Sequence, residues 1–170
     1  RRAKGPAACG RSRLSDGLCP VLTLDGNMNV HFSSATDLHA TPQEFFDKLN
    51  AEFGFTLDVC ATNENAKCES YYTKQDDGLA QPWRGNVWMN PPYEREIGRW
   101  MEKANRAAKE GATVVCLVPA RTDTTWWHEC AIQHEVRFIR GRLKFGDAKN
   151  SAPFPSAVIV MRSGVGHNLL

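Results

Sequence analysis

The sequence has no long apolar run, no closely spaced pair of cysteines and only a small net charge. No apolar stretch approaches the roughly 18 residues that a membrane-spanning helix needs, so we expect no membrane span. None of the six cysteines forms a CxxC pair, the spacing typical of zinc sites. His128, Cys130 and His134 are close in sequence, but their spacing does not bring three ligands onto one helix face. We therefore expect no bound metal, and reduced thiols in a cytoplasmic protein.

Glycine-rich phosphate-binding motifs are also missing. Neither GxGxxG nor GxxxxGK[ST] follows a segment that reads as a strand, which argues against a nucleotide-phosphate site. The formal charge is +2, and residues 1–27 carry five Lys or Arg against two Asp, a net of +3 that leaves −1 on the rest. The average charge therefore does not indicate a nucleic-acid partner, and only a local basic patch could.

The length of 170 residues suits a single domain with a sizeable core. Residues 1–27 mix Arg, Gly, Ser and Ala without an apolar period, and they lack the apolar centre of a signal peptide. We predict a disordered basic extension over 1–27, one folded domain over 28–163 and a flexible tail over 164–170.

Hydrophobic periodicity predicts alternating strands and helices within the folded domain. A helix begins with Thr41 as N-cap, Pro42 at the first helical position and Glu44 completing a capping box, and Gly54 ends it. The other predicted elements are strands over 55–60, 70–73, 86–90, 112–119 and 156–162, half-exposed strands over 135–139 and 142–145, and helices over 97–110 and 123–133. This alternation predicts an α/β fold, a mostly parallel sheet with helices on both faces.

Three predicted strands end in polar or turn residues, at 58–61, 90–93 and 119–122. Parallel sheets bind ligands beyond the carboxyl ends of their strands, so we expect the functional site at this edge.

The tetrapeptide Asn90-Pro91-Pro92-Tyr93 carries the most specific chemistry at this edge. Two prolines end the strand and leave backbone carbonyls without competing N–H groups. The Asn90 side chain offers an acceptor oxygen, and Tyr93 offers a flat ring. Together they could clamp a planar NH₂ group with two acceptors and stack on its ring, which would localise the nitrogen lone pair for attack. The alternative is an ordinary turn before a helix.

The sequence resembles the phage-type, Dam-like family of DNA N6-adenine methyltransferases over most of its length, roughly residues 32–162. The resemblance rests on the ordered segments TPQEFFDKLN, FGFTLDVCAT, DDGL, WMNPPY, CLVPARTDTTWW, GRLKFG and APFPSAVIV. It implies a Rossmann-like domain that transfers a methyl group from S-adenosylmethionine to the exocyclic amine of adenine in DNA, within a bacterial host cell. Alternatives are a methyltransferase acting on RNA or a protein glutamine amide, or an inactive DNA-binding prophage remnant.

The resemblance also implies site residues. The catalytic residues would be Asn90, Pro91, Pro92 and Tyr93, with a flipped adenine stacked on Tyr93. The residues implied for the cofactor are Thr41, Pro42, Asp58, Cys60, Ala61, Asp77 and Leu79, with Asp76 as the rival of Asp77. Two features depart from the family pattern: Ala61-Thr62-Asn63 replaces the usual glycine-rich turn, and the segment after Asp58 is too short for a crossover helix.

The expected partner is double-stranded DNA, and the chain is expected to act as a monomer or weak dimer. A cluster of basic residues within 137–149, and Arg121 beside the end of the strand over 112–119, could contact phosphates. The candidates are Arg121, Arg137, Arg140, Arg142 and Lys144. Trp126 and Trp127 could either stack on bases or lie in the core.

Overall fold

The computed structural model describes residues 39–146 and 148–164, which belong to a compact unit spanning His31–Leu170. The predicted extension over 1–27 and the tail beyond residue 164 lie outside the described residues. No helix in the described ranges is long and apolar enough to cross a membrane.

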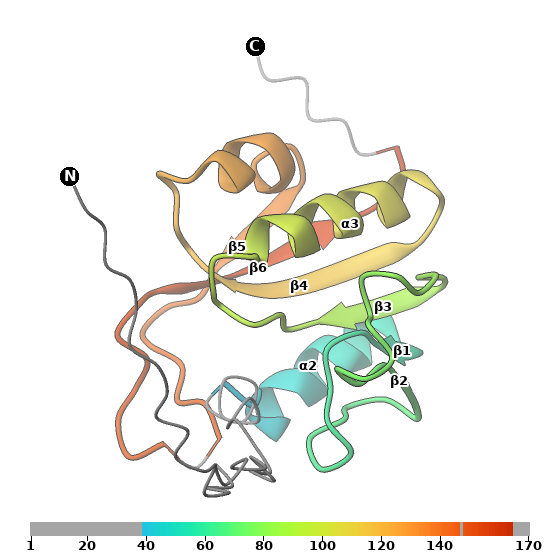
Figure 1. Cartoon of the computed structure of the whole chain (residues 1–170). Helices are drawn as coiled ribbons and strands as arrows, with labels where there is room; N and C mark the ends of the chain where they lie inside the picture. Colours follow the sequence, from blue (N-terminus) through green and yellow to red (C-terminus); the bar gives the residue numbers. More distant parts are fainter. Residues whose placement is uncertain (1–38, 147, 165–170) are drawn as a thin grey trace, which may run out of the picture. The chain divides into compact units, whose positions relative to one another are not determined.

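A six-stranded sheet forms the centre of this unit (Figure 1). The strands are β1 (Leu57–Asp58), β2 (Ser70–Tyr71), β3 (Asn86–Met89), β4 (Thr113–Pro119), β5 (Glu135–Phe138) and β6 (Ser156–Met161), in the order β2-β1-β3-β4-β6-β5. Strands β2, β1, β3 and β4 run parallel, whereas β6 is antiparallel to both of its neighbours. The α/β fold with a mostly parallel sheet is therefore confirmed.

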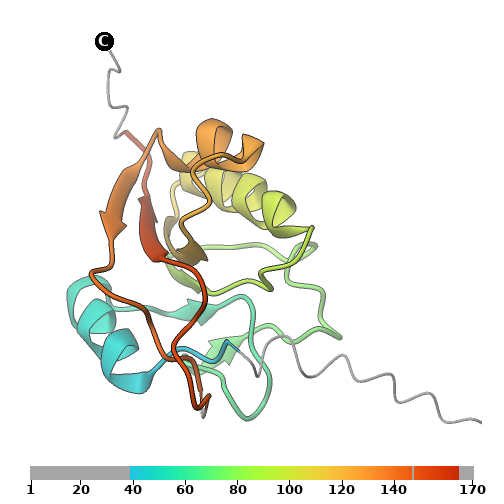
Figure 2. The same cartoon turned by 90° about the vertical axis from the view of Figure 1, so that its left-hand side faces the viewer.

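Helices cover both faces of the sheet (Figure 2). Helix α2 (Gln43–Phe53) lies on one face, where the Phe46 ring meets the Trp88 indole of β3 edge-on, with ring centroids 5.4 Å apart. Helix α3 (Ile97–Lys109) packs on the other face against β4 and β6, beside the short π-helical turn η1 (Trp127–Ala131). Side chains alternate along a strand, so the neighbours of Trp88 in β3 point toward α3 and are fully buried.

Two local predictions are wrong. Thr41 does not cap α2; the N-cap is Pro42, and no side chain caps the helix start. The segment 142–145 forms no strand, because it crosses the end of the sheet as a loop: the N–H of Ala152 bonds to the carbonyl of Leu143, and the N–H of Gly146 to that of Ala40. The predicted end of α2 at Gly54 is confirmed, since this residue is left-handed (φ 60°) and its N–H bonds to Asn50.

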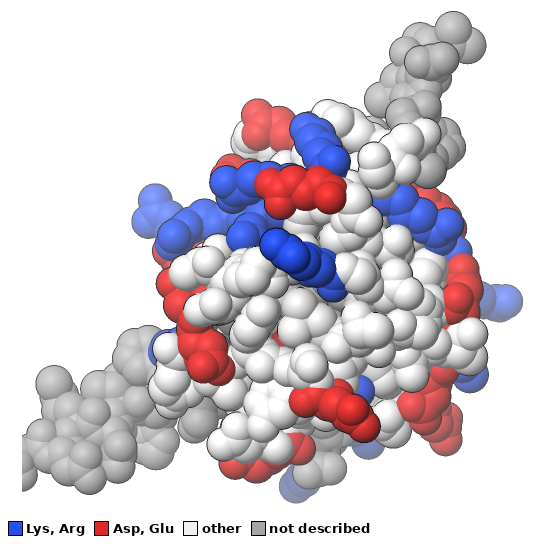
Figure 3. Space-filling view, turned by 90° about the vertical axis from the view of Figure 1, so that its right-hand side faces the viewer, with Lys and Arg blue, Asp and Glu red and all other residues white. Residues whose placement is uncertain are grey.

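At the end of the parallel strands where β3 and β4 begin, a hollow of about 500 Å³ adjoins the last turns of α3. Its lining includes Trp83, the three cations Arg84, Lys103 and Arg106, and one carboxylate, Glu110. Figure 3 shows this side of the molecule, on which basic and acidic side chains lie next to one another.

Candidate active site at the ends of the parallel strands

The carboxyl ends of β1 and β3 border a small pocket that is partly open to solvent and encloses about 20 Å³. That volume holds about one water molecule, whereas small-molecule pockets measure about 300–1,000 Å³, so a ligand would have to displace part of the lining. It is lined by His39, Ala40, Thr41, Asp58, Cys60, Asn65, Lys67, Trp88, Asn90 and Pro91. The parallel pairing of β1 with β3 sets Asp58 level with Trp88, and Asn90 follows one residue beyond β3.

Asp58 is a buried carboxylate at the floor of the site, with 3% of its surface exposed. Its two oxygens accept hydrogen bonds from the backbone N–H groups of Cys60 and Lys67, both at 3.1 Å. Burial raises the pKa of Asp58 to about 6, and the two backbone donors oppose that rise. The same bonds fold the chain back between β1 and β2, so a carboxylate organises the turn where the family usually has glycines.

Asn90 projects an amide into the pocket region, and both its nitrogen and its oxygen form hydrogen bonds. Its Nδ2 donates to the carbonyl oxygen of His39 at 2.7 Å and to Oγ1 of Thr41 at 3.1 Å. Its Oδ1 accepts a hydrogen bond of 2.7 Å from the Tyr93 hydroxyl, which also lies 3.3 Å from the carbonyl oxygen of Leu117. The Thr41 hydroxyl therefore bonds to the Asn90 amide and does not cap helix α2.

Tyr93 is buried, with 8% of its surface exposed, and burial raises the pKa of its phenol well above the usual range. Three rings surround it: His39 at a centroid distance of 4.7 Å, Phe154 at 5.5 Å and Phe145 at 5.9 Å. The ring is thus enclosed and does not present an open face for stacking, which differs from the expectation for this residue. His39, Phe145 and Phe154 were missed because their spacing in sequence carries no sign of this cluster.

The pocket unites five of the predicted residues: Thr41, Asp58, Cys60, Asn90 and Pro91. Among the described residues, its lining adds Asn65 and Lys67, which no sequence pattern singled out, and it does not include Pro42, Ala61, Asp77 or Leu79.

The loop that holds Asp77 nevertheless lies close to the end of β1. A Cβ on Gly78 would clash with the carbonyl oxygen of Val59, so only glycine permits this approach. Asp77 is itself left-handed (φ 52°) and exposed, whereas Asp76 accepts bonds from the N–H and hydroxyl of Thr73.

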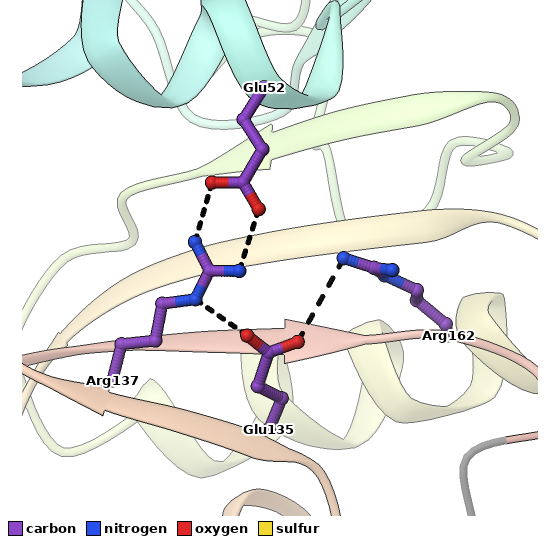
Figure 4. Close-up of polar contacts among 4 residues, drawn as sticks. All are labelled: Glu52, Glu135, Arg137 and Arg162. Atoms are coloured by element: carbon purple, nitrogen blue, oxygen red, sulfur yellow. Dashed lines mark hydrogen bonds and ion pairs between the residues drawn. The ribbon is translucent and has the colours of Figure 1, made fainter.

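Arg137, a predicted DNA contact, forms ion pairs within the domain. Its guanidinium binds both oxygens of Glu52 on α2 at 2.6 and 2.7 Å, and its Nε bonds to Glu135 at 2.6 Å (Figure 4). Arg162 lies 3.9 Å from the other oxygen of Glu135, and both arginines lie 5.3 Å from the Phe53 ring centre. This network ties α2 to the sheet.

The remaining predicted basic residues are exposed near the carboxyl ends of the strands. Arg140, Arg142 and Lys144 belong to the loop that follows β5, and Arg121 follows β4. The Arg121 guanidinium donates to the carbonyl oxygen of Tyr93 at 3.2 Å, which ties it to the site.

Trp126 and Trp127 are buried, 9% and 3% exposed, which favours the core alternative for both. Among residues 39–146 and 148–164, no group of three or more His, Cys, Asp or Glu is placed to hold a metal ion.

Fold and site together define an α/β domain with a narrow, largely polar pocket at the carboxyl ends of its parallel strands, next to an Asn-Pro-Pro-Tyr element. Residues 30–162 match the family described as DNA N-6-adenine-methyltransferase (Dam), and the chain belongs to this family.

Individual relatives agree with this assignment. The chain is similar to the DNA N-6-adenine-methyltransferase of Escherichia phage T1, 34% identical over 96 residues that cover 55% of this chain and 40% of the phage protein. It is also similar to the enzyme of the same name from Haemophilus phage HP1 (strain HP1c1), 32% identical over 100 residues, 57% of this chain and 58% of that protein. The protein YfdM of Escherichia coli strain K12 is 35% identical over 89 residues, 47% of this chain and 98% of YfdM. The chain thus spans about half the length of the two phage relatives.

Proposed function

We propose that this chain transfers a methyl group from S-adenosylmethionine to the N6 amine of adenine in double-stranded DNA. The observation that carries the proposal is the position of the Asn90 amide, which stands at the end of β3 beside a narrow pocket with a buried carboxylate. An amino-methyltransferase needs an acceptor for an amine hydrogen next to a separate site for its methyl donor. Membership of the Dam family supports the reading.

The pocket residues fit a cationic cofactor with polar and apolar parts. The Asp58 carboxylate supplies negative charge, Thr41 and Asn65 supply hydrogen-bonding groups, and the Trp88 indole supplies apolar surface. We assign Thr41, Asp58 and Cys60 to cofactor binding. We assign Asp77 and Leu79 to the opposite end of the cofactor, because Gly78 brings their loop against the end of β1. When bound, S-adenosylmethionine supplies an electrophilic methyl group on a sulfonium.

The chain's own residues bring the adenine amine to that methyl group. Oδ1 of Asn90 and the Pro91 carbonyl accept the two amine hydrogens, which draws the nitrogen lone pair out of conjugation with the ring and aims it at the methyl group. As the new N–C bond forms, the bond between the methyl group and sulfur breaks, its electron pair stays on a neutral thioether, and the methylated amine then loses one proton to solvent. The adenine leaves the duplex to reach the site, a step that costs a few kcal/mol. It enters beside Tyr93, where one of the enclosing rings moves aside to admit it.

The loop after β5 is the part of the chain best suited to hold DNA. It carries exposed Arg140, Arg142 and Lys144, and the Phe145 ring anchors it against Tyr93. Phosphate contacts from this loop would place the duplex next to the pocket. Arg121 adds a further cation at the end of β4.

Transfer of a labelled methyl group from S-adenosylmethionine to duplex DNA, RNA and a glutamine-containing peptide tests the proposal. We expect N6-methyladenine in DNA only. Labelled RNA or peptide would favour the other substrates, and cofactor binding by calorimetry without any transfer would indicate an inactive remnant.

The Asn90→Ala variant sharpens the test. It should lower the single-turnover rate by about 100–1,000-fold, by analogy with a lost oxyanion donor, and leave cofactor affinity nearly unchanged. Asn86→Ala is the matched control, because Asn86 lies at the opposite end of the same strand and its amide bonds to the carbonyl of Phe53. Full activity in folded Asn90→Ala would overturn the proposed chemistry.

A further inference from the structure

The Asn90 side chain can enter the reaction in only one of its two orientations. An amide carries an acceptor oxygen on one side and a donor NH₂ on the other. If the NH₂ faced the substrate amine, two donors would oppose each other and the amine could not be held. The orientation of this amide therefore decides whether the site can work.

The surroundings of Asn90 fix that orientation. A backbone carbonyl can only accept a hydrogen bond, so the Asn90 atom that lies 2.7 Å from the His39 carbonyl oxygen must be the nitrogen. Thr41 Oγ1, at 3.1 Å, accepts the second hydrogen of the same NH₂ group. Thr41 is 5% exposed, so water does not readily replace it.

The side-chain oxygen of Asn90 can accept a further hydrogen bond from the substrate. The Tyr93 hydroxyl donates to Oδ1, and the raised pKa of the buried phenol keeps that hydroxyl protonated. A carbonyl oxygen accepts two hydrogen bonds, so one position remains open for the incoming amine.

We propose that the Thr41 hydroxyl and the His39 carbonyl act as positioning groups that hold the Asn90 amide with its oxygen toward the substrate amine. This inference rests on the proposed function and adds a role for Thr41 that differs from cofactor binding: it acts through Asn90. A hydroxyl before α2 thus sets the orientation of an amide after β3, 49 residues away in sequence.

Substitution of Thr41 separates positioning from cofactor binding. Thr41→Val keeps the shape of the side chain and removes the acceptor. We expect the single-turnover methylation rate at saturating S-adenosylmethionine to fall about tenfold, the rate equivalent of one ordinary hydrogen bond, in addition to any loss of cofactor affinity that the variant shows. Thr41→Ser restores the acceptor and should restore the rate. Loss of cofactor affinity with an unchanged rate at saturation would overturn the inference.

Thr56→Val is the matched control. Thr56 precedes β1 at the far end of the β1–β3 pair, and its hydroxyl donates to the carbonyl of Asn86 at 3.2 Å. Its rate should equal that of the wild type. An equal fall in both variants would indicate a general loss of structure and would overturn the inference.

A second measurement does not require activity. The side-chain NH₂ signals of Asn90, assigned in ¹H–¹⁵N spectra by their loss in Asn90→Ala, should shift and exchange faster in Thr41→Val and return in Thr41→Ser. Unchanged signals would overturn the positioning role. If the wild type methylates nothing, the proposed function fails, and these signals alone decide whether Thr41 orients Asn90.

Asn90→Asp adds a pH readout. An ionised carboxylate at this position has no hydrogen to donate, so its oxygen would face the His39 carbonyl oxygen without a hydrogen bond. A protonated carboxyl could donate its O–H to that carbonyl, as the Asn90 amide does. The variant's rate relative to wild type, at saturating cofactor, should therefore rise as the pH falls. A ratio that is constant with pH would contradict the inference.

Discussion

The Tyr93 hydroxyl donates a 2.7 Å hydrogen bond to the side-chain oxygen of Asn90, so the last residue of the tetrapeptide supports the first. From the sequence, Tyr93 would serve only as a ring, and its replacement by phenylalanine would be mild. The structure leads to a different prediction. Tyr93→Phe should lower the free energy of unfolding by about 1 kcal/mol, because a buried hydrogen bond is lost, and should slow methyl transfer by loosening Asn90. Chemical denaturation beside single-turnover assays measures both effects.

Tyr93→Ala should be far more damaging than Tyr93→Phe. The ring packs among His39, Phe145 and Phe154, and removal of a buried aromatic side chain costs about 3–5 kcal/mol. If Tyr93→Phe matched the wild type in both stability and rate, the hydroxyl would have no part in the site. Denaturation curves of the two variants, compared with wild type, give the answer.

Cofactor affinity should depend on the ionisation of Asp58. Burial raises the pKa of this carboxyl to about 6 in the unliganded protein, and a cationic ligand prefers the ionised form. Affinity should therefore rise with pH and level off above about pH 7, and below pH 6 it should fall by up to tenfold per pH unit. Calorimetry at several pH values, in buffers of different ionisation enthalpy, should show proton release on binding at low pH. Asp58→Ala should bind weakly with no such dependence.

The same carboxyl should influence the stability of the unliganded protein. Its pKa when folded, about 6, lies above the ordinary value of 3.8, so the neutral form is the one that the fold favours. This contribution is fully present below about pH 4 and is lost as the pH rises through 6. Asp58→Ala should lack this component of the pH dependence of unfolding. An identical pH profile in the wild type and the variant would remove Asp58 as its source.

Arg142→Ala should weaken DNA binding without changing cofactor affinity. The residue is exposed on the loop that Phe145 anchors beside the site, and each lost phosphate contact lowers the slope of log K against log salt by about 1. Binding to labelled duplex DNA at several salt concentrations measures this slope. A slope in Arg142→Ala equal to that of the wild type would show that Arg142 makes no phosphate contact.

Arg137→Ala provides the contrast from the same basic segment. Its guanidinium is held by Glu52 and Glu135, so its removal should lower the melting temperature and leave the salt slope of DNA binding unchanged. Glu52→Gln should lower the melting temperature in the same way, because it breaks the bidentate pair from the other side. A reduced salt slope in Arg137→Ala would show that this residue does contact DNA phosphate.

The sequence by itself determined the elements and the edge at which they act. Continuous apolar runs predicted strands β4 and β6, and the diproline after Met89 marked the end of β3, because period and proline chemistry act within a few residues. Asp58 ends β1 and Asn90 follows β3, and these strands are parallel, so the meeting of the two residues at one edge could be foreseen. The prediction that the segment after β1 is too short for a crossover helix is also correct, because β2 follows β1 without an intervening helix.

Only the tertiary structure decided which partners these residues take. Local pattern assigned Thr41 to a helix cap, Arg137 to DNA and Tyr93 to an open stacking face, and each instead meets groups from distant segments. The antiparallel direction of β6 and the loop over 142–145 likewise depend on contacts between distant segments. Sequence pattern reflects neighbours within one or two turns of chain, whereas a buried hydroxyl or guanidinium bonds to whatever group the packing of the whole sheet brings within 3 Å or so of it.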